Sequence, residues 1–499
     1  MIIQENKYIK TLIIFLSYYF LNIFNAETFS QVPFIEIDTN FSSANLLVPT
    51  GMKVHNLFSE GEIVINNKNQ KHPSKGYLSQ VTFISSNNDN TQGLLYISHE
   101  CNDTNKYLGD GAGGTLVKIK KIDDAWVTQS RYLNVDFSPV GNSCMNAGSL
   151  LAPNQKLIIC ENNQYSSNKQ LYRKRKGIRD TANYNGIKRF QNMGWITEVD
   201  LEKKVATQKI FAMGRFAHES ILMMPDSLTY YLTDNHVPSV FFKYISDSIQ
   251  DLTIGKLFAF KQNHNDSLSN WIELPMSIDS LINIREVALN AGATIFMDLR
   301  GMCLVDQNIY IAEFGIDKFN VTKKSCLNGT IAHHLTNLNG TVNLPYGTIL
   351  NYNSLNNNID ALLYGSKDTI SGKTFNNPQT MSKFLIDQNT FLVFGEGNSN
   401  SENDELKKTK YIDESADLWW LNLSTVTPTL DDLSRFGLAP AGFSFKGGTF
   451  TPDFKTYFTS LNKNPVKGNQ IKRRSNTLAI TGFRDKIIRE RKAKVKNVK

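Results

Sequence analysis

Short apolar runs separated by polar turns dominate the chain between residues 34 and 462. The runs are rich in β-branched and aromatic residues, and clusters of Gly, Asn, Asp or Ser lie between them, which is typical of strands joined by turns. Only residues 279–290 have apolar positions at helical spacing and predict a helix. The clearest predicted strands are residues 78–84, 94–98, 115–119, 157–160, 195–199, 230–233, 241–245, 256–260, 309–313, 391–394 and 418–423.

So many strands in one chain must hide their edges, either by closing into a ring or by stacking two sheets. The pattern therefore predicts an all-β fold, either a β-propeller or a large sandwich. The propeller is favoured because the runs recur without a strict repeat, as degenerate blades would, and we expect six blades with loop insertions. No linker rich in Pro, Gly or Ser divides residues 27–462, so we expect one domain there.

The first residues of the chain are typical of an export signal. Lys7 and Lys10 precede an apolar run over residues 11–24, which ends at Asn25 and Ala26. This run is too short for a membrane helix, which needs about 20 residues. Residues 1–26 therefore predict a signal peptide of general secretory type. We expect the mature protein to be secreted or periplasmic, without a transmembrane segment.

The net charge of +8 is concentrated at the C-terminal end. Residues 463–499 contain 13 Lys or Arg and two acidic residues, which leaves the preceding residues with a net charge of −3. We therefore predict a flexible basic tail over residues 463–499 and a body that does not bind nucleic acid. The five cysteines are few and odd in number, so no dense disulfide framework is expected.

Acidic and thiol groups lie at the ends of several predicted strands. Glu161 directly follows Cys160 at the end of an apolar run, Glu219 follows another run, and Cys144 lies in a polar turn. Carboxylates that converge at strand ends repel one another unless cations hold them. Carboxylates suit calcium, and a thiolate suits a softer metal such as iron. Because no serine elbow, His-Glu-x-x-His helix or phosphate loop occurs, the pattern indicates a metal site.

A series of motifs follows one order along the chain. The motifs are Ser98-His99-Glu100, Cys144, Cys160-Glu161, Gly194-Trp-Ile-Thr-Glu-Val-Asp200, Gly214-Arg-Phe-Ala-His-Glu219, Gly255-Lys-Leu-Phe-Ala-Phe260, Gly292-Ala-Thr294, Asn308-Ile-Tyr-Ile311 and Thr451-Pro-Asp-Phe-Lys-Thr-Tyr-Phe458. In this order they resemble the PhoX family of alkaline phosphatases. The most specific parts are the Gly-Arg-Phe-x-His-Glu element and the Cys followed by Cys-Glu.

The resemblance implies a propeller with an iron and calcium cluster that hydrolyses phosphate monoesters outside the cytoplasm. Its partner would be a small phosphorylated substrate, and we expect a monomer. By motif, Cys144 would be the thiolate ligand of iron, and Glu161 and Glu219 would be carboxylate ligands. The cations would neutralise the phosphate oxygens, and an arginine would bind the phosphate.

The chain departs from the family pattern at several site positions. Where the family has Arg-x-Glu, this chain has Asp298-Leu-Arg300, and we predict Asp298 and Arg300 as the catalytic pair with exchanged charges. Gln379 and Ser444 stand at two further departures, and Glu396 is predicted as a replacement metal ligand. The departures leave two functions open, a phosphatase and a non-catalytic propeller that binds a ligand or partner. Hydrolysis of other esters or lactones in a calcium propeller is a third possibility.

Overall fold

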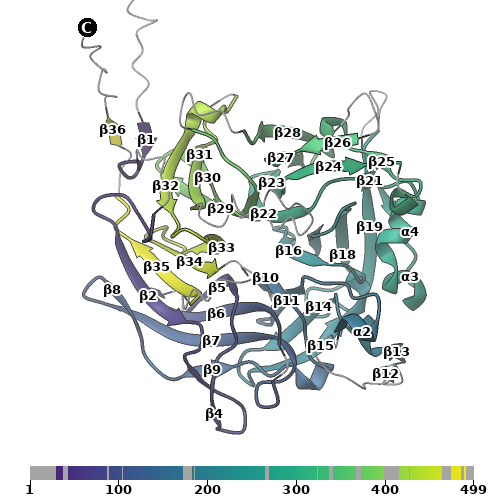
Figure 1. Cartoon of the computed structure of the whole chain (residues 1–499), viewed down its shortest axis with the longest axis horizontal. Helices are drawn as coiled ribbons and strands as arrows, with labels where there is room; N and C mark the ends of the chain where they lie inside the picture. The colour runs from purple at the N-terminus through teal and green to yellow at the C-terminus, as the bar shows by residue number, and fades with distance from the viewer. Residues whose placement is uncertain are drawn as a thin grey trace, which may run out of the picture.

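The described residues of the computed structural model form a ring of sheets around a central axis (Figure 1). The predicted signal peptide lies outside the described residues. Within the described ranges, no helix is long and apolar enough to cross a membrane. The structure describes residues 30–37, 43–86, 89–103, 105–171, 183–184, 186–263, 269–322, 324–335, 341–366, 373–397, 415–425, 427–463, 474–484 and 488–490.

Three sheets that are formed early in the chain make up half of the ring. The first contains β3 (Ile63–Ile65), β4 (Lys71–Pro73), β5 (Leu78–Ser86), β6 (Asp89–Asp103), β7 (Gly111–Ile122), β8 (Ala125–Thr128) and β9 (Tyr132–Asn134). The second contains β10 (Asn146–Leu151), β11 (Leu157–Glu161), β14 (Ile196–Asp200) and β15 (Val205–Ile210). The third contains β16 (His218–Met223), β17 (Thr229–Asp234), β18 (Phe241–Ser246), β19 (Gly255–Lys261) and β20 (Asn270–Glu273).

Three further sheets of four strands each complete the ring. The first of these contains β22 (Leu299–Val305), β23 (Asn308–Glu313), β27 (Thr348–Asn353) and β28 (Asn358–Tyr364). The next contains β29 (Pro378–Ile386), β30 (Asn389–Glu396), β31 (Asp417–Asn422) and β32 (Leu433–Leu438). The last contains β33 (Phe443–Phe450), β34 (Thr456–Lys463), β35 (Asn476–Thr481) and β2 (Lys53–Ser59).

Small elements decorate the ring. The predicted helix at 279–290 is present as two short helices, because Asn283 ends the first and precedes the second. The helices are α2 (Asn168–Leu171), α3 (Ile278–Ile282) and α4 (Ile284–Asn290). The two-stranded pairs are β1 (Ser30–Val32) with β36 (Ile488–Glu490), β12 (Asn183–Tyr184) with β13 (Ile187–Lys188), β21 (Thr294–Ile295) with β25 (Thr330–Ile331), and β24 (Ile316–Asn320) with β26 (Thr341–Leu344).

The two ends of the chain close the ring together. β2, near the start of the chain, pairs antiparallel with β35, near its end, and becomes the outer strand of the last sheet. Closing a ring in this way removes an exposed strand edge. The prediction that the domain ends at residue 462 and that a flexible tail follows is therefore wrong where the tail includes β35, because β35 is a strand of the last sheet. The apolar positions of this short strand are flanked by basic residues, which hid the strand in the charge count.

The core lies between neighbouring sheets, so a strand can be apolar on both of its faces. Trp419 and Trp420 are consecutive residues of β31 and point to opposite faces. Trp419 packs in the cluster shared with Phe394, whereas Trp420 packs with Phe34 and Phe436 on the other side. This double burial explains why the strands appear in the sequence as continuous apolar runs. The prediction of an all-β propeller, rather than a sandwich, is confirmed.

Candidate functional site

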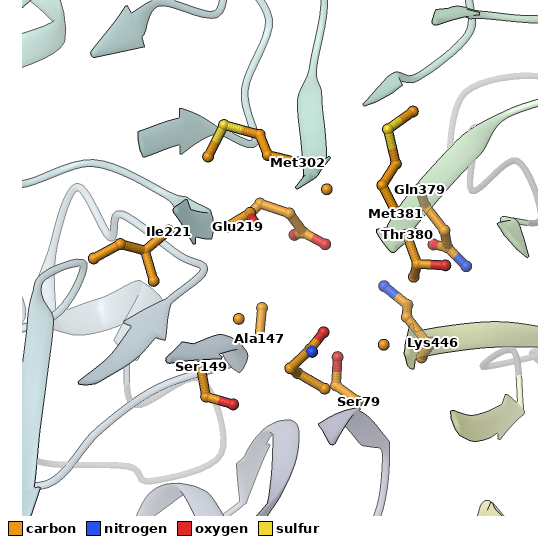
Figure 2. A pocket seen from close by; sticks show the side chains of 15 residues that line it. Ser79, Ala147, Ser149, Glu219, Ile221, Met302, Gln379, Thr380, Met381 and Lys446 are labelled. Atoms are coloured by element: carbon orange, nitrogen blue, oxygen red, sulfur yellow. The ribbon is translucent and has the colours of Figure 1, made fainter. Parts of the chain in front are cut away.

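A cavity of about 170 Å³ lies on the axis, where the inner strands of the sheets meet (Figure 2). Residues of β5, β10, β16, β22, β29 and β33 line it. Each of these strands has an irregular register where it reaches the cavity, and such bulges re-aim side chains at functional sites. The irregularities lie between Leu78 and Val81, Asn146 and Ser149, His218 and Ser220, Leu299 and Met302, Pro378 and Thr380, and Lys446 and Thr449.

Three carboxylates and two cationic side chains lie together at this cavity, and we call them the axial charge cluster: Glu100, Glu219, Asp298, Arg300 and Lys446. Lys446 Nζ lies 3.2 Å from Glu100 Oε2. Arg300 joins the other two carboxylates, with Nη2 2.7 Å from Asp298 Oδ2 and Nη1 3.6 Å from Glu219 Oε2. Glu219 and Lys446 also line the cavity, and Figure 2 shows both pointing toward its centre.

Neutral donors connect the carboxylates of the cluster. Asn162 Nδ2 donates to Glu100 Oε1 at 3.0 Å and also to Glu219 Oε2. Asn235 Nδ2 donates to the same oxygen of Glu219 at 3.0 Å. Ser79 Oγ donates to Glu100 Oε2 at 3.0 Å. Because one amide joins Glu100 and Glu219, both carboxylates lie within reach of a single small ligand.

Burial and charge set the pKa values of the cluster in opposite directions. Burial raises the pKa of Glu219 and of Asp298, although the neighbouring cations partly offset this effect. Burial would also raise the pKa of Glu100, but Lys446 and Arg300 outweigh it and lower that pKa. The pKa of Arg300 is raised, because Asp298 and Glu219 outweigh the effect of burial. Glu100 therefore favours the ionised form, whereas Glu219 and Asp298 take up protons more readily.

Some buried polar atoms of the site have no hydrogen-bond partner among the described residues. They are Asn162 Oδ1, Asp298 Oδ1 and Arg300 Nε. Buried polar groups are normally paired with protein or with ordered water. The site therefore offers two acceptors and one donor to water or to a polar ligand.

The Gly-Arg-Phe-x-His-Glu motif positions Glu219. Arg215 is buried and donates from Nε to the Met193 carbonyl at 2.7 Å and from Nη2 to the Tyr165 carbonyl at 2.6 Å. The His218 Nε2 lies 3.0 Å from the Gly214 carbonyl oxygen. Arg215 and His218 thus bind backbone carbonyl oxygens. Of the charged residues in the motif, Glu219 is the one that reaches the cavity.

Two backbone positions allow the strands to bring these side chains together. Asp298, which directly precedes β22, has a φ of 54°, a left-handed conformation that aspartate adopts more readily than most residues. Gly447, next to Lys446, has a φ of 63°, and a Cβ atom there would lie 2.6 Å from Gln80 Cα. A side chain at position 447 would therefore separate β33 from β5, so glycine is required there.

The predicted ligands Cys144 and Glu161 lie outside the axial charge cluster. The Cys144 thiol is buried, donates to the Asn163 carbonyl at 3.6 Å, and has a raised pKa because of burial and the nearby Glu161. Glu161 Oε2 accepts the backbone N–H of Gly194 at 2.8 Å, and Oε1 lies 2.7 Å from Lys209 Nζ. Both oxygens of Glu161 thus already have protein partners.

Glu396, the predicted replacement ligand, is the last residue of β30. Its carboxylate accepts the backbone N–H of Asn376 at 3.0 Å, the backbone N–H of Asp417 at 3.1 Å and the indole N–H of Trp419 at 2.9 Å. Of the predicted site residues, the structure brings together Glu219, Asp298 and Arg300.

Glu100 belongs to a repeated pattern. In five sheets, the strand next to the innermost one ends in or near an acidic residue. Three of the others accept backbone N–H groups, and the fourth, Asp234, pairs with Arg285 of α4. Glu100 is different, because its partners are the side chains of Ser79, Asn162 and Lys446. The repeated acids are Glu100, Glu161, Asp234, Glu313 and Glu396.

Sequence analysis did not select Glu100 or Lys446 as site residues. Glu100 occurs in a motif of the resemblance, so the repeated acid at the end of an apolar strand could have identified it. Lys446 follows no such pattern, because a lysine on a strand reads as a solvated side chain.

The contacts around these residues do not fit the predicted iron and calcium cluster. Within the part of the chain that the structure describes, no three His, Cys, Asp or Glu side chains gather closely enough to hold one metal ion. Lys446 and Arg300 lie against the carboxylates of the axial charge cluster, and Lys209 lies against Glu161. A metal ion bound by these carboxylates would lie beside like charges at low dielectric.

Glu396→Gln is expected to make the free energy of unfolding depend less on pH between about pH 4.5 and pH 8. Burial and the adjacent Asp417 raise the pKa of Glu396 to about 8 from 4.5. Because the folded state holds this proton more tightly than the unfolded state, the stabilisation is complete below about pH 4.5 and is lost as the pH rises to about 8. The free energy of unfolding falls by at most about 1.4 kcal/mol per pH unit in this range. Denaturant unfolding across this range measures the slope. Glu273→Gln, at an exposed ion pair, is the control, and an unchanged slope in Glu396→Gln would contradict the assignment.

Comparisons with known proteins agree with this architecture. The family model described as "Alkaline phosphatase PhoX" matches residues 145–464, more than half of the chain. The structure of Pseudomonas fluorescens PhoX in complex with vanadate, a transition state analogue, is similar with a TM-score of 0.66 and 16% identity, over 91% of this chain and 98% of that one. This likeness shows the fold. No curated protein sequence matches the chain.

Two other solved structures are more distantly similar. The calcium structure of a Trichoderma reesei enzyme of carbohydrate-active family AA12 has a TM-score of 0.41 and 8% identity, over 89% of this chain and 99% of that one. The periplasmic gluconolactonase of Pseudomonas aeruginosa has a TM-score of 0.37 and 10% identity, again over 89% and 99%.

Proposed function

Because the chain belongs to the PhoX alkaline phosphatase family, we propose that it binds and hydrolyses phosphate monoesters in the axial cavity. One observation carries this proposal. Arg300 and Lys446 converge from two different sheets on three carboxylates beside the cavity. A guanidinium and an ammonium group are the side chains that proteins use to bind phosphate oxygens.

The two linked carboxyl groups of the cluster suit opposite roles in the reaction. Glu219 lines the cavity and has a raised pKa, so it can hold a proton, whereas Glu100 has a lowered pKa and stays ionised. Pairs of carboxyl groups whose pKa values are pushed apart are typical of an acid and a base. We therefore assign Glu219 as the general acid and Glu100 as the ionised group that orients the attacking water and accepts its proton.

In the reaction, water attacks the phosphorus atom while the bond from phosphorus to the ester oxygen breaks. The leaving oxygen takes the proton of Glu219, and the attacking water gives one proton to Glu100. Arg300 and Lys446 stabilise the negative charge on the phosphate oxygens. Proton exchange with solvent restores both carboxyl groups after alcohol and phosphate leave. No step uses the iron and calcium that the resemblance implies, because the contacts of the site do not fit them.

A second function is favoured by the same ion pairs. Arg300 lies 2.7 Å from Asp298 rather than free in the cavity. A centre whose cationic side chains are already held by carboxylates of the protein can bind phosphate without hydrolysing it. In that case the protein is a non-catalytic propeller that binds a phosphorylated ligand.

Turnover of a chromogenic aryl phosphate by the purified full chain tests the proposal. We expect release of the phenol at a rate proportional to protein concentration, and Arg300→Gln to reduce kcat/KM by about 10²-fold or more, because a charged hydrogen bond to the transition state is lost. Inorganic phosphate should inhibit competitively. Phosphate binding without turnover would support the non-catalytic function instead.

Finer features of the protein form part of the same proposal. Six blades are supported by the six sheets of four or more strands in the described residues. A secreted or periplasmic location is supported by the export-type pattern of residues 1–26. A small phosphorylated substrate is supported by the size of the cavity, about 170 Å³. We keep the monomer as our expectation for the oligomeric state.

A further inference from the structure

Each carboxylate of the axial charge cluster already has a cationic partner from the protein. Lys446 Nζ lies 3.2 Å from Glu100, and Arg300 lies 2.7 Å from Asp298 and 3.6 Å from Glu219. The two cationic side chains are only 12% and 14% exposed. At low exposure, water screens these contacts weakly, so the cations neutralise much of the carboxylate charge.

The same arrangement recurs beside Cys144. Lys209 Nζ lies 2.7 Å from Glu161 Oε1, and these side chains are 2% and 0% exposed. A protein ammonium group therefore lies against the carboxylate of Glu161, which the resemblance implies as a metal ligand.

A divalent cation and a phosphate make opposite demands on this cluster. To bind a divalent cation, the carboxylates would have to release Lys446 and Arg300, which would then lie unpaired beside it. Breaking a buried ion pair in this way is costly. A phosphate dianion instead needs cationic donors. Lys446 lines the cavity, and Arg300 contacts Glu219, which also lines it. The two cationic side chains of the cluster thus suit an anion rather than a metal ion.

We infer that the axial centre binds a phosphate dianion through Lys446 and Arg300 without metal ions. In this chain the two side chains take the charge-neutralising role that the resemblance gives to iron and calcium. The inference rests on the proposed function, because it names the groups that hold the same phosphate. It applies to free phosphate and to the phosphate group of a monoester.

Metal analysis and calorimetry of the full chain test this inference together. The protein is purified, dialysed against EDTA, and analysed for iron, calcium, zinc and magnesium. Inorganic phosphate and benzylphosphonate, a stable analogue of a monoester, are then titrated with and without added calcium and iron. We expect much less than one metal ion per chain, and phosphate affinity that EDTA does not change. Tighter binding of benzylphosphonate would indicate a phosphate monoester as the natural ligand, and tighter binding of inorganic phosphate would indicate free phosphate.

Variants separate the charge of Lys446 from the fold. Lys446→Met should weaken phosphate binding by about tenfold or more, whereas Lys446→Arg should retain most of it, because a charged hydrogen bond is lost only in the first. Lys383→Met, which removes an exposed lysine from an inner strand, should bind like the unaltered protein. Melting temperatures show that each variant is folded.

Two results would overturn the inference. One is a metal ion retained at stoichiometric amount whose removal abolishes phosphate binding. The other is the failure of both phosphate ligands to bind, with or without metals. Metal-free binding without turnover would support the inference while the proposed hydrolysis fails, so the two proposals are tested separately.

Discussion

Glu219→Gln is expected to reduce kcat for an aryl phosphate by about 10²–10⁴-fold, the usual contribution of a general acid. Glutamine keeps the size of the side chain and can still pair with Asn235, but it carries no transferable proton. Because Arg300 and Lys446 are unchanged, affinity for inorganic phosphate should change much less than kcat. Steady-state kinetics with both measurements separates a lost proton donor from a lost binding site.

Glu198→Gln is the matched control for this variant. Glu198, on β14, is also buried, but it accepts a hydrogen bond from Thr207 Oγ1 on β15 at 2.7 Å and is not among the residues that line the cavity. The control should keep kcat within about a factor of two, because it leaves the transition state untouched. Equal kcat in Glu219→Gln and Glu198→Gln would show that Glu219 is not the general acid.

Lys209→Ala is expected to destabilise the protein by about 3–5 kcal/mol, the cost of leaving a buried charge unpaired. Lys209 and Glu161 are both almost fully buried, and their contact is 2.7 Å. Removing the ammonium group leaves Glu161 with neutral donors only, from Thr197 and the backbone. Denaturant unfolding of both proteins measures the difference in free energy.

Lys256→Ala provides the comparison at the surface. Lys256 pairs with Glu273 at 3.1 Å, but the two side chains are 60% and 56% exposed. Water and salt screen such a pair, so its loss should cost less than about 1 kcal/mol. A similarly small loss in Lys209→Ala would mean that Glu161 does not depend on Lys209 for its charge.

The propeller could be predicted because its core leaves a local signal. Strands packed between two sheets bury both faces, so they appear as short apolar runs, and the runs at 230–233 and 418–423 lie within β17 and largely within β31. β35 was missed, since its apolar residues lie between basic segments. The pairing of β35 with β2 joins the two ends of the chain, and no local pattern encodes such a contact.

The site was only partly predictable, because it depends on contacts between distant strands. Asp298 and Arg300 were recognised as exchanged charges, and the structure places them 2.7 Å apart. Glu161 and Glu396 follow apolar runs as Glu100 does, yet they bind backbone N–H groups within the fold. The sequence cannot separate these cases, because each acid has a similar local context. The approach of Lys446 to Glu100 requires the ring to be closed.

A crystal structure of the EDTA-treated full chain with bound orthophosphate tests the central claim most directly. The account predicts phosphate in the axial cavity, with its oxygens within hydrogen-bond distance of Arg300 and Lys446, and no metal ion between the carboxylates. Anomalous scattering would identify any metal that remains. Phosphate bound away from these two side chains, or held by metal ions between Glu100 and Glu219, would contradict the account.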